Sequence, residues 1–436
     1  MPGKYSPRHT RHRFVIGLAR SSPSISSGPL VRYLLALIIC TCVSTSAFAQ
    51  KPDMKSVELP SGVSYQFLGT YSVDRLNSIL TKELQEFAPD NTVTFAPAKN
   101  SVNLYRVAYM SVVPEQMNRR TRASGLIAVP NVPRKDLPVV MYQHGTVFSK
   151  TAVPSYPEES YETRLMIAQF AGDGYIVVAA DYFGKGLSDE PDSYLVKAST
   201  QQACVDMYYT AKVILNEVGY KPTSFFLSGW SQGGWATLVF LNHLENLKIP
   251  ITAAAAASAP ADIYTIMNRW INNWQPVDAV YLTGCAALQI NAHEFYYNSP
   301  GLSAGAFKPE YLQAARDLHA NRIAWSQYSA IVPKKVIDML QRDFVASSIG
   351  GETPYWQTLQ RTHGYRWRSV TPLRCYHGGM DEVTPIYIAE LPAGFQTLIG
   401  GGPTTAISAG PNADHRGVFI YGVKDQKTWF ASFGNK

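Results

Sequence analysis

Residues 224–234, Ser-Phe-Phe-Leu-Ser-Gly-Trp-Ser-Gln-Gly-Gly, constrain the fold of this chain more than any other stretch. An apolar, β-rich run ends at Gly229, Ser231 follows on a turn, and Gly233 and Gly234 come before a helical pattern over 235–247. A turn this sharp leaves little room for side chains beside the Ser, and it pushes the hydroxyl above the edge of the sheet. The pattern therefore predicts a strand, a tight turn that presents Ser231, and a helix.

The rest of the chain repeats this alternation of strand and helix. Apolar runs over 137–142, 175–180, 251–257 and 371–376 are typical of strands buried on both faces, and helical patterns cover 161–171 and 194–218. Shorter alternating runs over 102–113 and 123–129 indicate antiparallel strands at the start of the sheet, with a helix over 73–87. We predict an α/β fold with a mostly parallel central sheet flanked by helices.

Between 260 and 369 the alternation stops. This stretch is rich in Trp and Tyr, and Ile263, Met267, Trp270, Ile271 and Trp274 form one apolar stripe at helical spacing. We predict a helical cap over 261–368, inserted after the sixth strand, between core segments 50–260 and 369–436. Its aromatic side chains can serve as packing surface, and its underside can also form an apolar pocket for an acyl chain or an aromatic acid.

The net charge of +7 comes almost wholly from the front of the chain. Residues 1–49 hold six basic residues and no acidic one, which leaves 33 basic against 32 acidic residues in the remainder. We therefore expect neither nucleic acid nor an anionic surface as a partner. The oligomeric state is not indicated by the sequence.

The same front segment has the features of an export signal. A basic stretch precedes the apolar run 33–43, and Ala47-Phe48-Ala49 offers a small-x-small pattern for cleavage before Gln50. The apolar run is too short to cross a bilayer comfortably. We expect a signal segment over 1–49, a periplasmic or secreted protein, and no membrane span after cleavage. Because the basic portion is long, translation that starts near Val31 is a second possibility.

Three cysteines follow the signal segment: Cys204, Cys285 and Cys375. An oxidising compartment permits one disulfide among them, and the sequence does not indicate which pair would form it. Neither the cysteines nor the histidines have the spacing of a metal site, so we predict no bound metal.

Ser231 needs a base, and the base needs a carboxylate to orient it, because a serine hydroxyl is a poor nucleophile at neutral pH. The run 371–376 leads into His-Gly-Gly-Met-Asp-Glu, which places Asp381 on a loop at the same sheet edge as Ser231. Glu382 is a second candidate acid that we expect to face solvent, and Asp414 is a third. His415 lies in a polar loop 34 residues after Asp381. We predict Ser231 as nucleophile, Asp381 as acid and His415 as base; the alternatives are a serine that only begins a helix and a histidine that only occupies a surface loop.

Acyl transfer also requires two N–H groups that meet the negative charge on the carbonyl oxygen. Gln232, the residue after the nucleophile, supplies one of them. The other is expected in Tyr-Gln-His-Gly-Thr at 142–146, directly after the first long buried strand. We assign it to Thr146, with Gly145 forming the turn and His144 bracing it by hydrogen bonds.

These motifs together resemble those of the α/β-hydrolases, and among them the secreted lipases and esterases with a helical cap. Tyr-Gln-His-Gly-Thr, the Asp-Tyr-Phe-Gly run at 181–184, Gly-Trp-Ser-Gln-Gly-Gly, the Gly-x-Asp loop and the Asp-His loop occur in the family's order, over about residues 100–430. The resemblance implies an acyl-serine intermediate that water hydrolyses, without a metal or an organic cofactor. Trp230, before the nucleophile, is bulkier than the His or Tyr often found there.

The sequence thus favours a secreted hydrolase of carboxylic esters that acts on a small-molecule or lipid ester. A peptidase of the prolyl-oligopeptidase kind uses the same triad on amides, but residues 51–135 are too short for the large propeller that usually precedes such a domain. A binding protein on a hydrolase scaffold is a further alternative, although it would have no need of all three triad residues.

Overall fold

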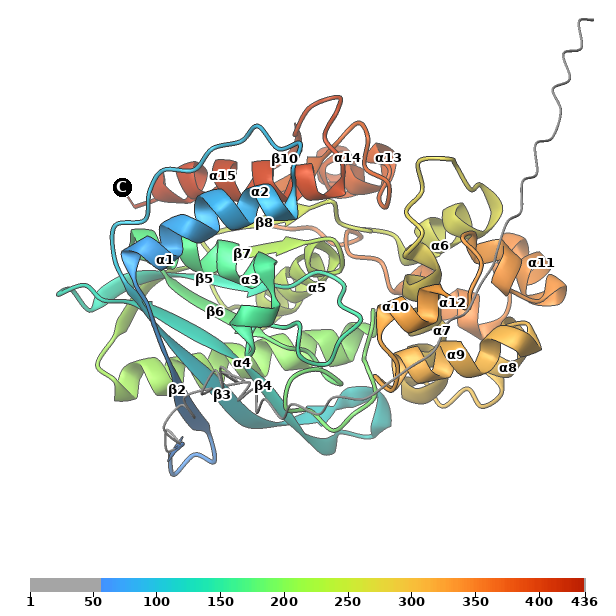
Figure 1. Cartoon of the computed structure of the whole chain (residues 1–436), viewed down its shortest axis with the longest axis horizontal. Coiled ribbons are helices and arrows are strands. Elements are labelled where there is room, and N and C mark those ends of the chain that lie inside the picture. The colour runs from blue at the N-terminus through green and yellow to red at the C-terminus, as the bar shows by residue number, and fades with distance from the viewer. Residues whose placement is uncertain (1–55, 435–436) are drawn as a thin grey trace, which may run out of the picture. The chain divides into compact units, whose positions relative to one another are not determined.

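The computed structural model describes residues 56–434, which belong to one compact unit. The predicted signal segment, its cleavage site before Gln50 and the second possible start near Val31 lie outside this range. Ten strands form one sheet in the order β1-β2-β3-β4-β6-β5-β7-β8-β9-β10 (Figure 1). Their bounds are β1 Val57–Glu58, β2 Ser64–Tyr71, β3 Val102–Val113, β4 Arg119–Pro130, β5 Asp136–Gln143, β6 Ile176–Ala180, β7 Lys221–Trp230, β8 Ala253–Ala257, β9 Leu373–His377 and β10 Thr404–Ser408.

The sheet changes from antiparallel to parallel pairing along its width. Strands β1 to β4 pair antiparallel, and β4 also pairs antiparallel with β6. From β6 through β5, β7, β8 and β9 to β10 every pairing is parallel. The prediction of a mostly parallel central sheet that begins with antiparallel strands is confirmed. Because parallel strands present their carboxyl ends at one edge, the loops after β5, β7 and β9 lie at the same edge of the sheet.

Helices cover both faces of the parallel part. The buried side chains of α4 (Lys197–Glu217) and α5 (Gln232–Asn246) join Val139 and Met141 of β5 in one apolar core. The alternate residues Val140 and Tyr142 join a second core with α3 (Tyr161–Gln169) and α15 (His415–Ala431). The same second core includes residues of α1 (Val73–Ser78) and the π-helical turn Ile79–Glu83, which α2 (Leu84–Phe87) continues. Side chains that alternate along one strand thus anchor helices on both sides.

The segment between β8 and β9 is built from helices, apart from one isolated bridge between Phe307 and Leu340. Its helices, yellow to orange at one end of the molecule in Figure 1, are α6 Ile263–Asn272, α7 Leu282–Tyr296, α8 Leu302–Ala306, α9 Pro309–His319, α10 Trp325–Ser329, α11 Arg342–Gly350 and α12 Pro354–Arg361. We call residues 261–368 the helical insertion; that it acts as a cap remains a prediction. It follows the eighth strand and not the sixth, because β1 and β2 precede the strands that the apolar runs indicated.

Several boundaries differ from the expected ones. Helix α5 begins at Gln232, directly after Ser231, and not at Trp235. Helix α6 ends at Asn272, so Trp274 of the predicted stripe lies beyond it, whereas Ile263, Met267, Trp270 and Ile271 are buried as expected. The short helices α13 (Ile386–Ala389) and α14 (Leu391–Ile399) lead to β10, an edge strand that the sequence pattern did not indicate.

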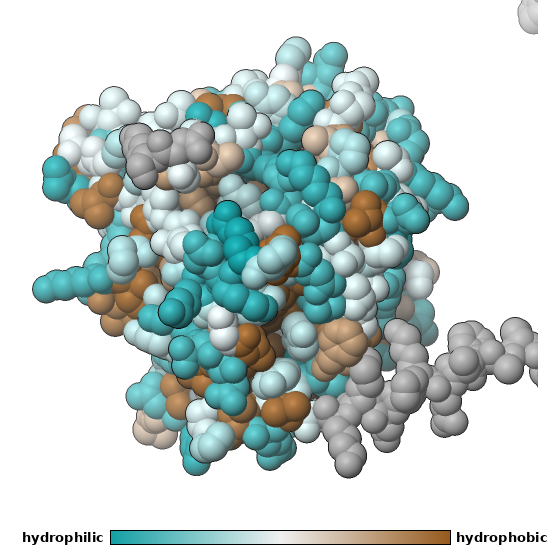
Figure 2. All heavy atoms as spheres, turned by 90° about the vertical axis from the view of Figure 1, so that its left-hand side faces the viewer, coloured by the Kyte–Doolittle hydropathy of each residue, from teal (hydrophilic) through white to brown (hydrophobic). Residues whose placement is uncertain are grey.

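Figure 2 shows the side of the molecule that lies at the left of Figure 1, away from the helical insertion. Hydrophobic residues are scattered there among hydrophilic and neutral ones. Single exposed apolar side chains are usual on folded proteins, so this face does not point to a binding surface.

Candidate active site

Ser231 lies between the end of β7 and the start of α5, in a backbone conformation that residues other than glycine rarely adopt. Its φ is 58° and its ψ is −124°, and its N–H donates to the carbonyl of Ala257 in β8 at 2.9 Å. A non-glycine residue held in such a region costs about 1–3 kcal/mol, which the surrounding structure must offset. The tight turn predicted from the sequence is therefore present, with Ser231 at its apex.

Two glycines make this turn possible. A Cβ at Gly229 would collide with the carbonyl oxygen of Gly233, the second residue of α5. A Cβ at Gly233 would collide with the carbonyl oxygen of Gln143, at the end of β5. The absence of side chains thus lets α5 approach both its own strand and the loop after β5, which brings Gln232 close to the predicted oxyanion turn.

Asp381 and His415 are brought together across the chain. Nδ1 of His415 lies 2.9 Å from Oδ1 of Asp381, and both side chains are buried. The same carboxylate oxygen accepts the N–H groups of Val383 at 3.0 Å and Thr384 at 2.9 Å, so the acid has a fixed orientation. A carboxylate only accepts hydrogen bonds, and the Nδ1–H of His415 must therefore be the donor, which leaves Nε2 free to take a proton.

The pair also shifts both pKa values in the direction that an ion pair requires. Burial of the imidazole alone would lower the pKa of His415, but the charge and hydrogen bond of Asp381 outweigh burial and raise it. Burial likewise works to raise the pKa of Asp381, and His415 and its other hydrogen-bond donors lower it overall. Asp381 is thus held as a carboxylate that stabilises a protonated His415.

The other two candidate acids lie near His415 but do not touch its ring. Glu382 accepts the backbone N–H of His415 at 2.9 Å and the hydroxyl of Tyr281 at 3.3 Å. The expectation that Glu382 faces solvent is therefore wrong: it is half-buried, because the start of α7 packs against its loop. Asp414 caps α15 by accepting the N–H of Gly417 at 2.7 Å.

Of the three residues predicted as a triad, Ser231 is the one whose side chain has no hydrogen bond to the other two within residues 56–434. The hydrogen bonds of residues 56–434 join His415 to Asp381 and do not include one between Ser231 and His415. The two residues are linked through Trp230, whose indole ring lies 4.8 Å from the imidazole of His415 between ring centres. Hydrogen bonds of this kind are often long in unliganded enzymes and tighten when substrate binds.

Thr146 and Gln232 both present N–H groups that lack a partner among the described residues. Gln232 is the first residue of α5, where helix geometry leaves the N–H without an acceptor. Thr146 lies on the loop after β5, and its hydroxyl lies 2.9 Å from that of Tyr194. His144 braces this loop, with Nδ1 at 2.8 Å from the carbonyl of Gly145 and Nε2 at 3.0 Å from that of Asp181.

Glu162, a buried residue of α3, holds the loop from the opposite side. Its Oε2 accepts the N–H of Gly145 at 3.0 Å and the hydroxyl of Tyr142 at 2.6 Å. Glu162 could not be predicted as a site residue from the sequence, since a Glu in a predicted helix is normally exposed. Its contact with the turn depends on the fold. A buried carboxylate with two donors fixes the position of the glycine that precedes Thr146.

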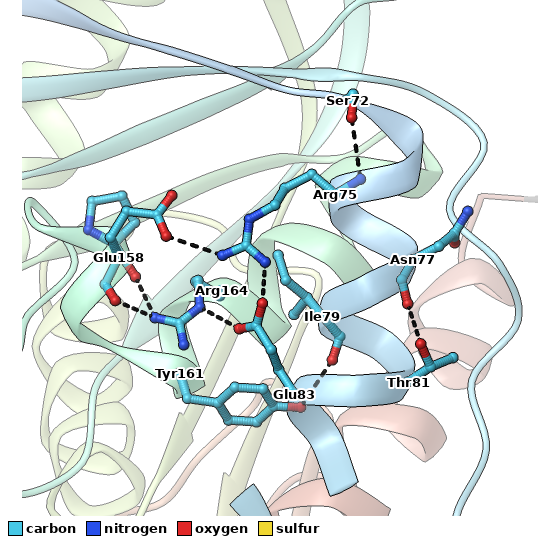
Figure 3. Close-up of polar contacts among 10 residues, drawn as sticks. Ser72, Arg75, Asn77, Ile79, Thr81, Glu83, Glu158, Tyr161 and Arg164 are labelled. Carbon is cyan, nitrogen blue, oxygen red and sulfur yellow. Dashed lines mark hydrogen bonds and ion pairs between the residues drawn. The ribbon is translucent and has the colours of Figure 1, made fainter. Parts of the chain in front are cut away.

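Helix α3 is in turn fixed by a group of charged residues that Figure 3 displays. Arg164, two residues after Glu162, donates through Nε to Glu83 at 2.7 Å. Glu83, the last residue of the π-helical turn, also pairs with Arg75, and Arg75 reaches Glu158 at 3.0 Å. These pairs join the α1–α2 segment to the helix that holds Glu162.

The helical insertion contacts the loops after both β5 and β9. The N–H of Ala279, just before α7, donates to the carbonyl of Glu382 at 3.1 Å. At the other loop Trp325 stacks on Phe148, with ring centres 4.7 Å apart. Residues 146–152 and 321–325 line an open cavity of about 540 Å³, and Thr146 is therefore one of its lining residues. This cavity, which we call the Thr146 groove, is therefore a candidate site for part of a substrate.

The three cysteines of the described chain are free and buried, so the disulfide that an oxidising compartment would permit is not formed. Burial raises the pKa of all three thiols, to about 12 for Cys285 and Cys375. Within residues 56–434, His, Cys, Asp and Glu side chains do not gather in a group of three that could hold a metal ion. In the same range no helix is both long and apolar enough for a bilayer span.

Comparison with known proteins supports the fold. No protein-family model and no curated protein matches the chain. A candidate hydrolase from Legionella pneumophila is 23% identical, with a TM-score of 0.75 over 87% of this chain and 98% of its own. The rice cell wall degrading esterase LipA from Xanthomonas oryzae is 19% identical, with a TM-score of 0.71 over 85% and 96%. Candida antarctica lipase A in its closed state is 15% identical, with a TM-score of 0.61 over 88% and 86%. At these identities the agreement is one of fold.

Proposed function

We propose that this chain, which has the α/β-hydrolase fold, is a serine hydrolase of carboxylic esters. The observation that carries the proposal is the buried pair of His415 and Asp381 at 2.9 Å, on the same sheet edge as Ser231 in its strained turn. A histidine held this way has one nitrogen fixed by a carboxylate and the other free for proton transfer. The esterase and lipase activities named for two proteins of the same fold favour esters over amides.

In the first half of the reaction, the hydroxyl oxygen of Ser231 attacks the ester carbonyl. Nε2 of His415 takes the hydroxyl proton, and the carbonyl oxygen becomes negatively charged. The N–H groups of Thr146 and Gln232 stabilise that charge, and Asp381 stabilises the protonated imidazole. When the intermediate collapses, the bond to the alcohol breaks and His415 gives its proton to the departing oxygen.

In the second half, water replaces the alcohol. His415 takes a proton from the water, whose oxygen attacks the acyl group on Ser231. Collapse releases the acid and returns the proton to Ser231, so the enzyme ends as it began. The groups named here belong to the chain itself, and the sequence resemblance implies neither a metal nor a cofactor for these steps.

The protein is also proposed to be exported, with cleavage before Gln50. The support is the basic and apolar pattern of residues 1–49 and the small residues Ala47 and Ala49. Mass spectrometry of the protein from its native host would find Gln50 as the first residue. A mature chain that retains residues 1–49 would contradict export by this route.

The function is tested by turnover of p-nitrophenyl esters from acetate to palmitate, beside peptide p-nitroanilides. Ser231→Ala should abolish ester turnover, and Ser61→Ala, which removes an exposed serine hydroxyl, serves as the matched control. Labelling with a fluorophosphonate in the wild type but not in Ser231→Ala would identify the nucleophile independently. Full ester turnover by Ser231→Ala would contradict the proposal, and cleavage confined to the anilides would support the peptidase.

A further inference from the structure

Trp230 contacts three separate parts of the candidate active site. Its backbone directly precedes Ser231, at the end of β7. Its Nε1–H donates to the backbone carbonyl of His415 at 3.0 Å, and its ring is tilted against the imidazole of His415, with ring centres 4.8 Å apart and 41° between the planes. The third part is the turn at Gly145, where a Cβ would lie 3.1 Å from Cε3 of the indole.

Other aromatic rings also pack against the indole. Phe419 of α15 stacks on it, with ring centres 4.8 Å apart and 22° between planes, and Phe87 meets it edge-on at 6.4 Å. Arg416 holds Phe87 in turn, because it donates to the carbonyl of Phe87 at 2.8 Å and lies over its ring. Contacts with Phe419 and Phe87 thus help to fix the indole in place.

We propose that Trp230 is a positioning residue that holds the imidazole of His415 and sets its distance from the oxyanion turn. This inference rests on the function proposed above. Its indole N–H fixes the first residue of α15, and its ring, centred 4.8 Å from the imidazole, favours the protonated imidazole that forms during the reaction. The same ring limits how far Gly145, and with it the N–H of Thr146, approaches the nucleophile.

This role explains why an indole occupies the position before Ser231. A benzene ring could stack on His415 but has no N–H for the backbone carbonyl. Without that bond the start of α15 keeps only the contact of the His415 N–H with Glu382 and the cap at Asp414, so the imidazole is held less firmly relative to Asp381. Since Asp381 raises the pKa of His415, a looser contact lowers that pKa.

Trp230→Phe tests the proposal, with Trp356→Phe as the matched control. Trp356 is also buried and loses an indole hydrogen bond, to Ser347 at 2.9 Å in the helical insertion, without contact to His415. NMR titration of His415, assigned by comparison with His415→Gln, measures its pKa without any substrate. In Trp230→Phe we expect a lower pKa, and kcat reduced about 10- to 100-fold per active site titrated with fluorophosphonate. KM should stay within about twofold, because substrate binding is not altered.

The outcomes separate positioning from simple packing. An unchanged pKa of His415 and an unchanged kcat, with a loss of thermal stability like that of Trp356→Phe, would overturn the proposal. If Trp230→Phe does not fold, Phe419→Leu provides a second test, because it loosens the indole while leaving Trp230 and His415 intact. It should also lower the pKa of His415. An unchanged pKa of His415 in Phe419→Leu would overturn the inference. Ester turnover retained by Ser231→Ala would refute the proposed function alone, since the titration of His415 needs no activity.

Discussion

Glu382 accepts the backbone N–H of His415 at 2.9 Å, while the neighbouring Asp381 accepts the ring N–H of the same histidine at the same distance. Two adjacent carboxylates therefore hold one residue at two points. Glu382 also accepts the hydroxyl of Tyr281, so it connects the loop after β9 to the helical insertion. The two carboxylates have different tasks, because only Asp381 contacts the imidazole.

Substitution of each carboxylate separates these tasks. Asp381→Asn keeps the shape of the acid but removes the charge that stabilises protonated His415, and we expect kcat to fall about 10⁴-fold. Glu382→Gln keeps an acceptor for the backbone N–H, so kcat should fall less than about 10-fold. Steady-state kinetics on a p-nitrophenyl ester compare the two. Equal losses in both variants would show that Glu382, and not Asp381 alone, supports the base.

The pH dependence of activity should follow the raised pKa of His415. The base must be neutral to accept the proton of Ser231, so kcat/KM rises with pH as His415 loses its proton. Because the pKa of His415 is raised from 6.5, the midpoint of this rise should lie above pH 6.5. In Asp381→Asn the midpoint should move to lower pH, since the main cause of the increase is gone. A wild-type midpoint below 6.5 would contradict this account of the pair.

Stability should depend on the same two groups with opposite signs. The pKa of His415 is raised in the folded protein. Its contribution to the free energy of unfolding is therefore complete below its pKa in the unfolded chain, and it is lost as pH rises through its pKa in the folded protein. The pKa of Asp381 is lowered in the folded protein. Its contribution to the free energy of unfolding is therefore present above its pKa in the unfolded chain, and it is lost as pH falls through its pKa in the folded protein. Thermal melts of wild type and His415→Gln should therefore converge as pH increases above the folded pKa of His415. A difference between them that is constant across the whole pH range would contradict the linkage.

The parts of the site that sequence patterns predict are those that depend on local structure. A strand, a tight turn and a helix need glycines at fixed places, so Ser231 and its neighbours could be located from residues 224–234 alone. Asp381 and His415 follow from chain order and from the shared edge of parallel strands. Glu162 and Trp230 could not be assigned a role in this way. Their partners, Gly145 and His415, lie far away in the sequence, and neither side chain differs locally from one that only packs.

The edge strand β10 could also not be predicted from the sequence patterns. Strand β10 is partly exposed and carries Thr404-Thr405-Ala406-Ile407-Ser408, without the continuous apolar run that marks β6 or β8. Its pairing with β9 depends on the fold and not on its own side chains. The prediction that Glu382 faces solvent was wrong for the same reason. Its burial depends on the start of α7, which lies far away in the sequence and packs against it.

Removal of the charge on Glu162 should weaken the turn that is proposed to bind the oxyanion. In Glu162→Gln an amide oxygen replaces the carboxylate that accepts from Gly145 and Tyr142, and a neutral acceptor contributes about 1 kcal/mol where a charged one contributes about 1.5–3. We expect kcat to fall about 10-fold with little change in KM. Tyr142→Phe leaves the bond to Gly145 intact, and its loss should be smaller. A larger loss of kcat in Tyr142→Phe than in Glu162→Gln would show that Glu162 acts through Tyr142 of β5 and not through the turn at Gly145.

The free cysteines predict that reducing agents leave the protein unaffected. Cys204, Cys285 and Cys375 are buried and unpaired, and their raised pKa values keep them as thiols at neutral pH. Thermal melts with and without dithiothreitol should coincide, whereas loss of a disulfide typically lowers stability by about 2–5 kcal/mol. A thiol reagent should find three groups after denaturation of the mature protein and almost none before it. A melting temperature that falls on reduction would contradict this.

The Thr146 groove should determine which esters are accepted. Phe148 and Trp325 stack on each other and both line it, as does Thr146, the residue proposed to bind the oxyanion. Phe148→Ala enlarges the groove two residues after Thr146, so kcat/KM should shift toward longer or bulkier esters, because each methylene group that gains a contact contributes about 1–3 kcal/mol. Tyr311→Ala removes a half-buried aromatic ring of the insertion that does not line the groove, and it should keep the wild-type preference. Relative kcat/KM values from acetate to palmitate measure the shift. If Phe148→Ala and Tyr311→Ala have the same profile, the groove does not hold the varied part of the ester.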